Sequence, residues 1–370
     1  MTFGSIKPYS SVKWQDYDAL EPLFFSLDRP LSGYLAGKER GGHYVTVLEQ
    51  RWQQIFNVKH AIAVNSATSG LLAACVAAGI GSGDTVAVPA LTMSATAAAP
   101  LFLDADLVFQ DVFSDDFSMG DWPDQPVDAL IVTNLFGHPA RLTRVREYAD
   151  DTQAILIEDN AQSPFAMEGE RYAGTIGHMG VFSLNVHKHI QCGEGGIVVT
   201  NDDALAKTLR GVINHGEHMG GHLVGLNLRM PELCAAVALS QLQRGPTIIA
   251  DRVAQARQII AEIGDIYGVR PPVTRHGCTN VFYTIPFVIK NKRAEFCAVL
   301  RQHGVPIVEG YVDPLYRMPV FSEFAENGDC PVAERLHDKN LFYIENCAWD
   351  FTSEQIVRIG EAFREAAKLL

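Results

Sequence analysis

Long apolar runs are absent from this sequence. No stretch approaches the roughly 18 consecutive apolar residues of a membrane-spanning helix, and the first 20 residues lack the charged start and apolar centre of a secretory signal. Lys and Arg clusters are absent too, because 30 basic and 43 acidic residues are mixed along the chain and give a formal charge of −13. These absences predict a soluble, cytoplasmic protein that binds neither membrane nor nucleic acid.

The cysteine pattern lacks the spacing of a metal site or a disulfide framework. The number of cysteines is odd and no CxxC pair occurs. The seven residues are Cys75, Cys192, Cys234, Cys278, Cys297, Cys330 and Cys347. Their scatter predicts reduced thiols that mostly serve packing.

Short β-branched runs alternate with helical patterns between residue 61 and about residue 200. The runs are AIAVN, TVAVPA, LVFQDV, ALIVTN, AILIED and IVVTND, with helices expected from Thr68 and from about Thr92. This alternation predicts an α/β fold with a mostly parallel sheet covered by helices. Ligands of such sheets bind at the carboxyl ends of the strands.

The C-terminal part has a different pattern. A helical segment from Glu232 to about Ile263 is interrupted at Gly245-Pro246, where proline removes an N–H group and predicts a break. A strand over 281–289, a helix over 292–303 and a strand over 305–308 then indicate an α+β lobe. We therefore predict a large domain over residues 1–250 and a small one over 251–370.

The last helix is marked by its own capping signal. Thr352-Ser353-Glu354-Gln355 is a capping-box pattern. The apolar stripe that follows is expected to face the core, and it comprises Ile356, Ile359, Phe363, Ala366 and Leu370.

The stretch SLNVHKHIQCGEGG, residues 183 to 196, places Lys188 between two histidines and ahead of a glycine-rich turn. A metal site at His187 and His189 is disfavoured because no Cys or carboxylate cluster of suitable spacing is near. A nucleotide phosphate loop requires glycines before the lysine, and here they follow it. A covalent cofactor is the third interpretation.

Pyridoxal phosphate needs an amine, a carboxylate for its pyridine nitrogen and neutral donors for its phosphate. Asp159 ends the strand AILIED and is the candidate carboxylate, although a strand-end acid also commonly caps a turn. NSATSG, residues 65 to 70, opens a helix whose N–H groups would face an anion, although a simple helix cap looks the same. Ser183 is a further candidate for the phosphate.

Five motifs in order resemble the DegT/DnrJ/StrS family of sugar aminotransferases. They are SATSGL at 66–71, GDTVAVPALTMSAT at 83–96, EDNAQ at 158–162, SLNVHK with GEGG at 183–196, and GLNLRMPELCAA at 225–236. The resemblance runs from about Leu31 to Leu370. It implies fold type I of the pyridoxal phosphate transferases, with a seven-stranded sheet in the large domain.

The resemblance also implies roles for single residues. Lys188 would carry pyridoxal phosphate as a Schiff base and act as the proton-transferring base, and Asp159 would pair with the pyridine nitrogen. The remaining cofactor-binding residues would be Ala67, Thr68 and Ser183 at the phosphate, Gln162 at the ring oxygen, Met93 over the ring, and Asn227. The family's equivalent of Asn227 reaches the phosphate of a neighbouring subunit, so a homodimer with shared sites is implied.

Two positions depart from the family pattern. Met93 stands where an aromatic side chain usually stacks on the cofactor ring, and Leu184 stands where phenylalanine follows the serine. Methionine can cover an aromatic face through its polarizable sulfur, so cofactor binding is still expected.

The implied reaction moves an amino group from glutamate or glutamine to a keto-sugar, typically a keto-deoxysugar linked to a nucleoside diphosphate. Gly33, Lys38, Arg40 and His43 form a polar segment that either receives an anionic acceptor or is a solvated loop. Arg229 is assigned either to the donor carboxylate or to an ion pair between subunits.

Two rival functions are considered. Dehydratases of the family typically carry histidine in place of the Schiff-base lysine, and only Lys188 has five-residue spacings to both Ser183 and Gly193. A non-catalytic sensor of sugar or cofactor would not need to keep Lys188, Asp159 and Gln162 together.

Overall fold

A seven-stranded sheet forms the centre of the computed structural model, which describes residues 4–22, 41–120, 122–123, 125–220, 222–327 and 329–370. Its strand order is β2-β10-β9-β6-β5-β3-β4. Strand β10 is antiparallel to both neighbours, and the other pairs are parallel. The strands are β2 (His60–Val64), β3 (Thr85–Pro89), β4 (Asp106–Gln110), β5 (Ala129–Thr133), β6 (Ile155–Asp159), β9 (Met179–Ser183) and β10 (Gly196–Thr200). The predicted mostly parallel sheet is therefore confirmed.

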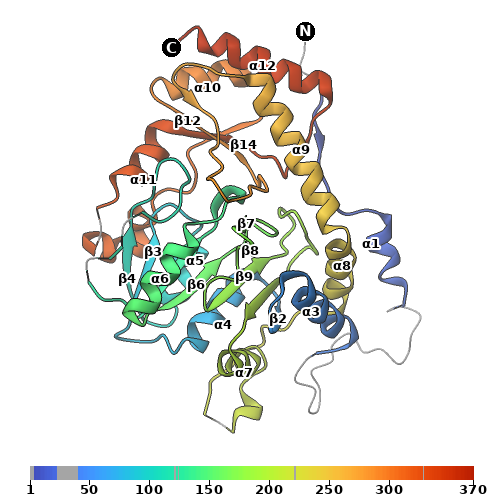
Figure 1. Cartoon of the computed structure of the whole chain (residues 1–370), viewed down its shortest axis with the longest axis vertical. Coiled ribbons are helices and arrows are strands. Elements are labelled where there is room, and N and C mark those ends of the chain that lie inside the picture. Colours follow the sequence, from blue (N-terminus) through green and yellow to red (C-terminus); the bar gives the residue numbers. More distant parts are fainter. Residues whose placement is uncertain (1–3, 23–40, 121, 124, 221, 328) are drawn as a thin grey trace.

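Helices cover both faces of this sheet (Figure 1). Successive strand residues point to opposite faces, so Ile62 and Val64 pack with the cluster of α4, whereas Ala61 and Ala63 pack with the cluster of α3. Burial on both sides explains why the strands are continuous apolar runs. The helices are α3 (His43–Phe56), α4 (Ala67–Ala77), α5 (Ala95–Leu101), α6 (Leu142–Thr152), α7 (Asp203–Val212) and α8 (Glu232–Gln243).

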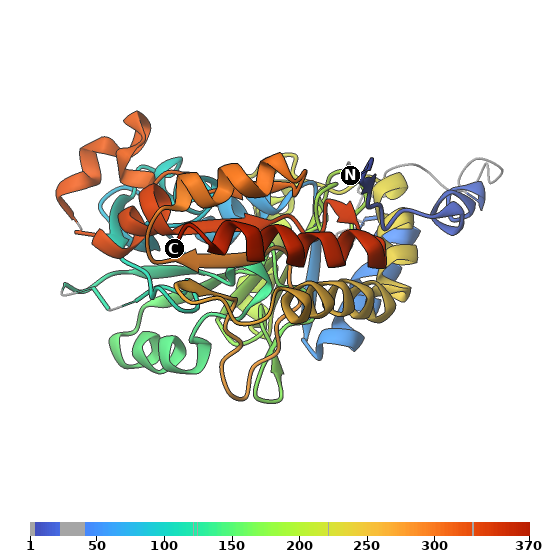
Figure 2. The ribbon, with the colours of Figure 1, turned by 90° about the horizontal axis from the view of Figure 1, so that it is seen from above.

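The C-terminal lobe lies above the sheet in Figure 1, and α9 (Gly245–Ile263) runs from α8 up to it. Figure 2 shows α9, α10 and α12 along this lobe. Its antiparallel sheet has the order β11-β12-β14-β13. The elements are β11 (Val269–Arg270), β12 (Ile285–Ile289), β13 (Ile307–Glu309), β14 (Leu341–Ile344), α10 (Arg293–Gln302) and α12 (Ser353–Ala367). The break at Gly245-Pro246 is confirmed, because α8 ends at Gln243 and proline lies in the first turn of α9.

Buried side chains between Leu315 and Leu336 pack into the cluster that contains the central strands, so part of the C-terminal third contacts the large core. The remaining short elements are β1 (Lys7–Pro8), α1 (Trp14–Asp18), η1 (Leu135–Gly137), β7 (Met167–Glu168), β8 (Arg171–Tyr172), η2 (Glu217–Met219), η3 (Leu315–Arg317), η4 (Pro319–Asn327), α11 (Pro331–Arg335), η5 (Leu336–Asn340) and β15 (Trp349–Asp350). Within the described residues, every helix is too short or too polar to cross a bilayer.

The capping box of α12 is confirmed. The Thr352 hydroxyl accepts from the Gln355 N–H at 3.2 Å, and the Gln355 side chain accepts from the Thr352 N–H at 3.0 Å. The four residues of the stripe from Ile356 to Ala366 are buried, but Leu370 is 39% exposed. Its assignment to the core was wrong because the helix ends at Ala367, so the helical period no longer directs that side chain inward.

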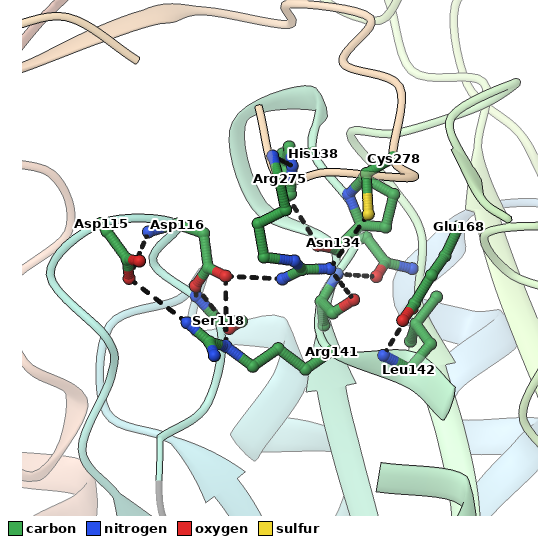
Figure 3. Close-up of polar contacts among 12 residues, drawn as sticks. Asp115, Asp116, Ser118, Asn134, His138, Arg141, Leu142, Glu168, Arg275 and Cys278 are labelled. Atoms are coloured by element: carbon green, nitrogen blue, oxygen red, sulfur yellow. Dashed lines mark hydrogen bonds and ion pairs between the residues drawn. The ribbon is translucent and has the colours of Figure 1, made fainter. Parts of the chain in front are cut away.

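A buried ionic cluster ties the loop after β4 to the segment between β11 and β12 (Figure 3). The Asp116 carboxylate is buried and lies 2.5 Å from Arg275 Nη1 and 3.3 Å from Arg141 Nε. The Arg275 backbone N–H donates to His138 Nε2 at 3.1 Å. His138 can accept this bond only in its neutral form, with Nδ1 as donor to the Pro139 carbonyl at 2.8 Å.

This arrangement predicts a pH-dependent stability. Burial lowers the pKa of His138 to about 4 from 6.5, so the unfolded chain binds more protons between these values. Stability from the neutral imidazole is fully present above pH 6.5 and is lost as the pH falls toward 4, by about 1.4 kcal/mol per pH unit. We expect His138→Gln to bind about one proton fewer on unfolding in this pH window. The free energy of unfolding should therefore depend less steeply on pH in the variant.

Denaturant titrations at several pH values measure this slope. The matched control is His276→Gln, which removes an exposed imidazole near the same segment. An unchanged slope in His138→Gln would show that His138 does not titrate with folding.

Candidate active site

A pocket of about 410 Å³ opens where β6 and β9 end. It brings together seven of the eight predicted site residues, which are Ala67, Thr68, Met93, Asp159, Gln162, Ser183 and Lys188. The other lining residues include three tyrosines, Tyr283, Tyr311 and Tyr343, and the carboxylates of Glu194 and Glu345. The amine of Lys188 and the carboxylate of Asp159 therefore share one cavity.

Asp159 is held by a chain of hydroxyl groups. Its Oδ2 accepts from Thr96 Oγ1 at 2.8 Å, and its Oδ1 accepts from the Ala161 N–H at 3.1 Å. Thr92 links Thr96 to Thr133, at 3.0 and 2.8 Å between hydroxyl oxygens. Burial raises the pKa of Asp159, and the two hydrogen bonds and the charge of Lys188 oppose that shift. A bound cation at this carboxylate would favour its ionised form.

Lys188 lies in the loop that follows β9. Burial lowers the pKa of its amine, while the charge of Asp159 opposes the shift. The Nζ atom lies 4.5 Å from the centre of the Tyr283 ring. The site therefore favours the neutral amine more than water does, which a nucleophile and base requires.

The N-terminus of α4 forms one end of the pocket. Ser66 caps the helix by accepting from the Ser69 N–H at 3.1 Å, and Ala67 and Thr68 follow in the first turn, whose N–H groups lack partners in the helix. Strand β10 approaches this turn closely, because a Cβ on Gly196 would lie 2.8 Å from the Ala67 nitrogen. Gly196, the last glycine of GEGG, cannot be replaced by a larger residue without a clash at this turn. The turn itself is a helix N-terminus, which is suited to bind an anion.

Gln162 is already bonded at both ends of its amide. Its Oε1 accepts from the Phe136 N–H at 2.8 Å and its Nε2 donates to the Tyr311 hydroxyl at 2.9 Å. The second Nε2 hydrogen is the group left for a ligand. Met93 is 50% exposed on the pocket, whereas Leu184 is buried in the core beside α3.

Asn227 is the predicted residue that the pocket does not include. It is exposed and forms an isolated β-bridge with Asn214. It does not cap α8, whose N-cap residue is Pro231. Arg229 donates to Asn214 Oδ1 at 2.7 Å. The segment with Gly33, Lys38 and Arg40 lies outside the described residues, and His43 begins α3.

The two histidines beside Lys188 occupy different environments. His189 is fully buried and its Nε2 lies 2.9 Å from the Val281 carbonyl oxygen, whereas His187 is exposed at the pocket. The described part of the chain contains no group of three or more His, Cys, Asp or Glu side chains placed to hold a metal ion.

Sequence reasoning missed several residues that line the pocket or support its side chains. Thr96 lies in a short helix start, where its hydroxyl resembles an ordinary cap. Tyr283 and Thr284 were placed inside a strand over 281–289, but that strand begins at Ile285 and the preceding residues line the pocket. Tyr311 and Tyr343 come from the C-terminal lobe, and only the folded chain reveals their contact with the site.

These groups fit pyridoxal phosphate. The pocket offers a buried amine for the Schiff base, a buried carboxylate for the pyridine nitrogen, and a helix N-terminus with hydroxyl residues for the phosphate. Together with the sheet order they define a fold type I, pyridoxal phosphate-dependent transferase. A family model described as the DegT/DnrJ/EryC1/StrS aminotransferase family matches residues 35–364. The chain belongs to this family and is an aminotransferase.

Relatives and solved structures agree with this assignment. The chain is 29% identical over 346 residues to GDP-perosamine synthase from Escherichia coli O157:H7, covering 88% of this chain and 90% of the relative. It is 30% identical to an L-glutamine:2-deoxy-scyllo-inosose aminotransferase from Streptomyces kanamyceticus, over 88% of this chain and 82% of the relative. The structure of S. venezuelae DesV in complex with a ketimine intermediate has a TM-score of 0.85 and 27% identity, covering 96% and 95% of the two chains.

Proposed function

We propose that this chain transfers an amino group from glutamate or glutamine to a keto-sugar linked to a nucleoside diphosphate, in the biosynthesis of an amino sugar. The observation that carries the proposal is the shared pocket of Lys188 and Asp159 at the N-terminus of α4. The names of relatives include a nucleotide-sugar product, GDP-perosamine, and an acceptor whose name contains no nucleotide, 2-deoxy-scyllo-inosose. The acceptor is therefore the part of the proposal that needs direct measurement.

The geometry of the pocket supports a role for each of its main residues. When bound, the cofactor supplies a ring that stabilises negative charge on the substrate carbon. Asp159 holds the proton of the pyridine nitrogen in place, and Thr96 orients Asp159 through its 2.8 Å bond. Lys188 Nζ would act as the general base that takes a proton from the donor α-carbon and then as the general acid that returns it to the reacting group. Its lowered pKa increases the neutral fraction that this step needs.

The remaining assignments concern the cofactor's other contacts. Ala67, Thr68 and Ser183 would hold the phosphate, Gln162 the ring oxygen through its remaining amide hydrogen, and Met93 one face of the ring. Asn227 is exposed and lies outside the pocket of its own chain. This placement supports a role at the cofactor phosphate of a second copy in a homodimer. A cytoplasmic location is supported by seven cysteines without a disulfide among them.

A spectroscopic half-reaction tests the function. Purified protein loaded with pyridoxal phosphate is expected to be yellow, and glutamate or glutamine should bleach its visible band. Adding a nucleotide-linked keto-sugar should restore the band, and the free sugar serves as the comparison. A band that no amino donor changes would instead indicate a non-catalytic sensor, and loss of a sugar hydroxyl without amination would indicate a dehydratase.

A further inference from the structure

A side chamber of about 160 Å³ adjoins the active-site pocket. Its lining residues are His187, Tyr283, Thr284, Glu345, Cys347 and Ala348, and the first four of these also line the main pocket. The chamber is next to the reacting amine, because Lys188 Nζ lies 4.5 Å from the Tyr283 ring centre. A substituent on a carbon held at Lys188 can therefore extend into it.

The size of the chamber limits its occupant. Its volume is less than half the 410 Å³ of the main pocket, and it is below the ~300 Å³ from which sites for whole small molecules begin. A sugar ring with its nucleotide does not fit such a space. The side chain of an amino acid does, which points to the donor.

The polar groups of the chamber select for an uncharged occupant. Glu345 contributes a carboxylate and His187 an imidazole, both of them exposed, and none of the six described lining residues is Lys or Arg. A second carboxylate placed there would be repelled, whereas an amide N–H₂ group would donate to Glu345. Thr284 is 4% exposed, and its buried hydroxyl has no partner among the described residues, so it is a free donor for an amide carbonyl.

We propose that this chamber binds the side-chain amide of the donor, and that Glu345 and Thr284 make the enzyme select L-glutamine over L-glutamate. The inference rests on the proposed transamination. In that half-reaction the α-amino group of glutamine would leave the donor together with two electrons and a proton, which the bound cofactor would accept. The donor α-carbon loses them, and water supplies its new keto oxygen. The side-chain amide is unchanged and serves only for recognition.

The donor half-reaction tests the proposal with the full-length holoenzyme and no acceptor. Bleaching of the cofactor band is followed with L-glutamine and with L-glutamate, and kcat/KM is expected to favour glutamine by at least ~10-fold, which corresponds to about 1.4 kcal/mol. Equal or faster reaction with glutamate would overturn this inference and leave the aminotransferase proposal standing. Failure of both amino acids would overturn both.

Two variants assign the selectivity to residues. Glu345→Gln is expected to reduce the preference for glutamine at least ~5-fold, because the repulsion of glutamate is removed. Thr284→Val should raise KM for glutamine several-fold with little change in kcat, and it should not destabilise the apoprotein because the hydroxyl has no partner to lose.

The matched control is Glu170→Gln, which removes an exposed carboxylate far along the chain from the chamber. It should leave the ratio of the two donors unchanged. If Glu345→Gln does not alter the ratio of kcat/KM for glutamine and glutamate, the Glu345 carboxylate does not recognise the donor side chain.

Discussion

Replacing Lys188 with alanine is expected to reduce transamination by at least ~10⁴-fold. The change removes the single lysine among the described residues that line the pocket. It removes both the attachment point of the cofactor and the base that moves the proton. Steady-state turnover with an amino donor and a keto-sugar measures the loss, and mass spectrometry after borohydride reduction shows whether the cofactor is still attached.

The controls separate chemistry from folding. Lys207→Ala removes an exposed lysine on α7 and should keep full activity. Small amines added to Lys188→Ala should restore part of the proton transfer, because the substitution leaves space in the pocket. Full turnover in Lys188→Ala would refute the assignment of this residue and redirect attention to His187, which also lines the pocket.

The sheet could be predicted because its strands carry a local signal. Runs such as ALIVT in β5 are buried at every residue, so apolar continuity alone marks them. The motifs at the strand ends were located for the same reason, since Asp159 is the last residue of β6 and α4 begins at Ala67, shortly after β2 ends at Val64. Parallel strands bring the residues at their carboxyl ends to one edge of a sheet, so this proximity can be predicted without knowing any distant contact.

The other wall of the site was not predictable in this way. Tyr311 reaches Gln162 from 149 residues away, and Thr284 and Glu345 meet at the side chamber from separate segments. No periodic pattern in the local sequence predicts these contacts, because they depend on how the C-terminal lobe packs against the sheet. The prediction that Leu370 faces the core was wrong for a related reason, because the apolar stripe in the sequence does not show that the helix ends at Ala367.

Asp159→Asn is expected to lower kcat/KM by about 10³-fold while the protein still binds pyridoxal phosphate. The amide has nearly the shape of the carboxylate and can still accept from Thr96, which now bonds Oδ2 at 2.8 Å. It carries no charge to keep a proton on the pyridine nitrogen. Kinetics and the cofactor spectrum as a function of pH measure the effect, and Asp151→Asn, an exposed change, is the control.

The same substitution should have the opposite effect on stability. Burial raises the pKa of Asp159, so the folded apoprotein binds more protons than the unfolded chain above the ordinary pKa of 3.8. Stability at this group is therefore lost as the pH rises and the carboxylate ionises, and a neutral amide avoids that loss. Apo Asp159→Asn should unfold at the same or a higher denaturant concentration than the unmodified apoprotein at neutral pH. A clear loss of stability together with activity would instead assign Asp159 a structural role, whereas lost activity in an equally stable protein would place it at the cofactor.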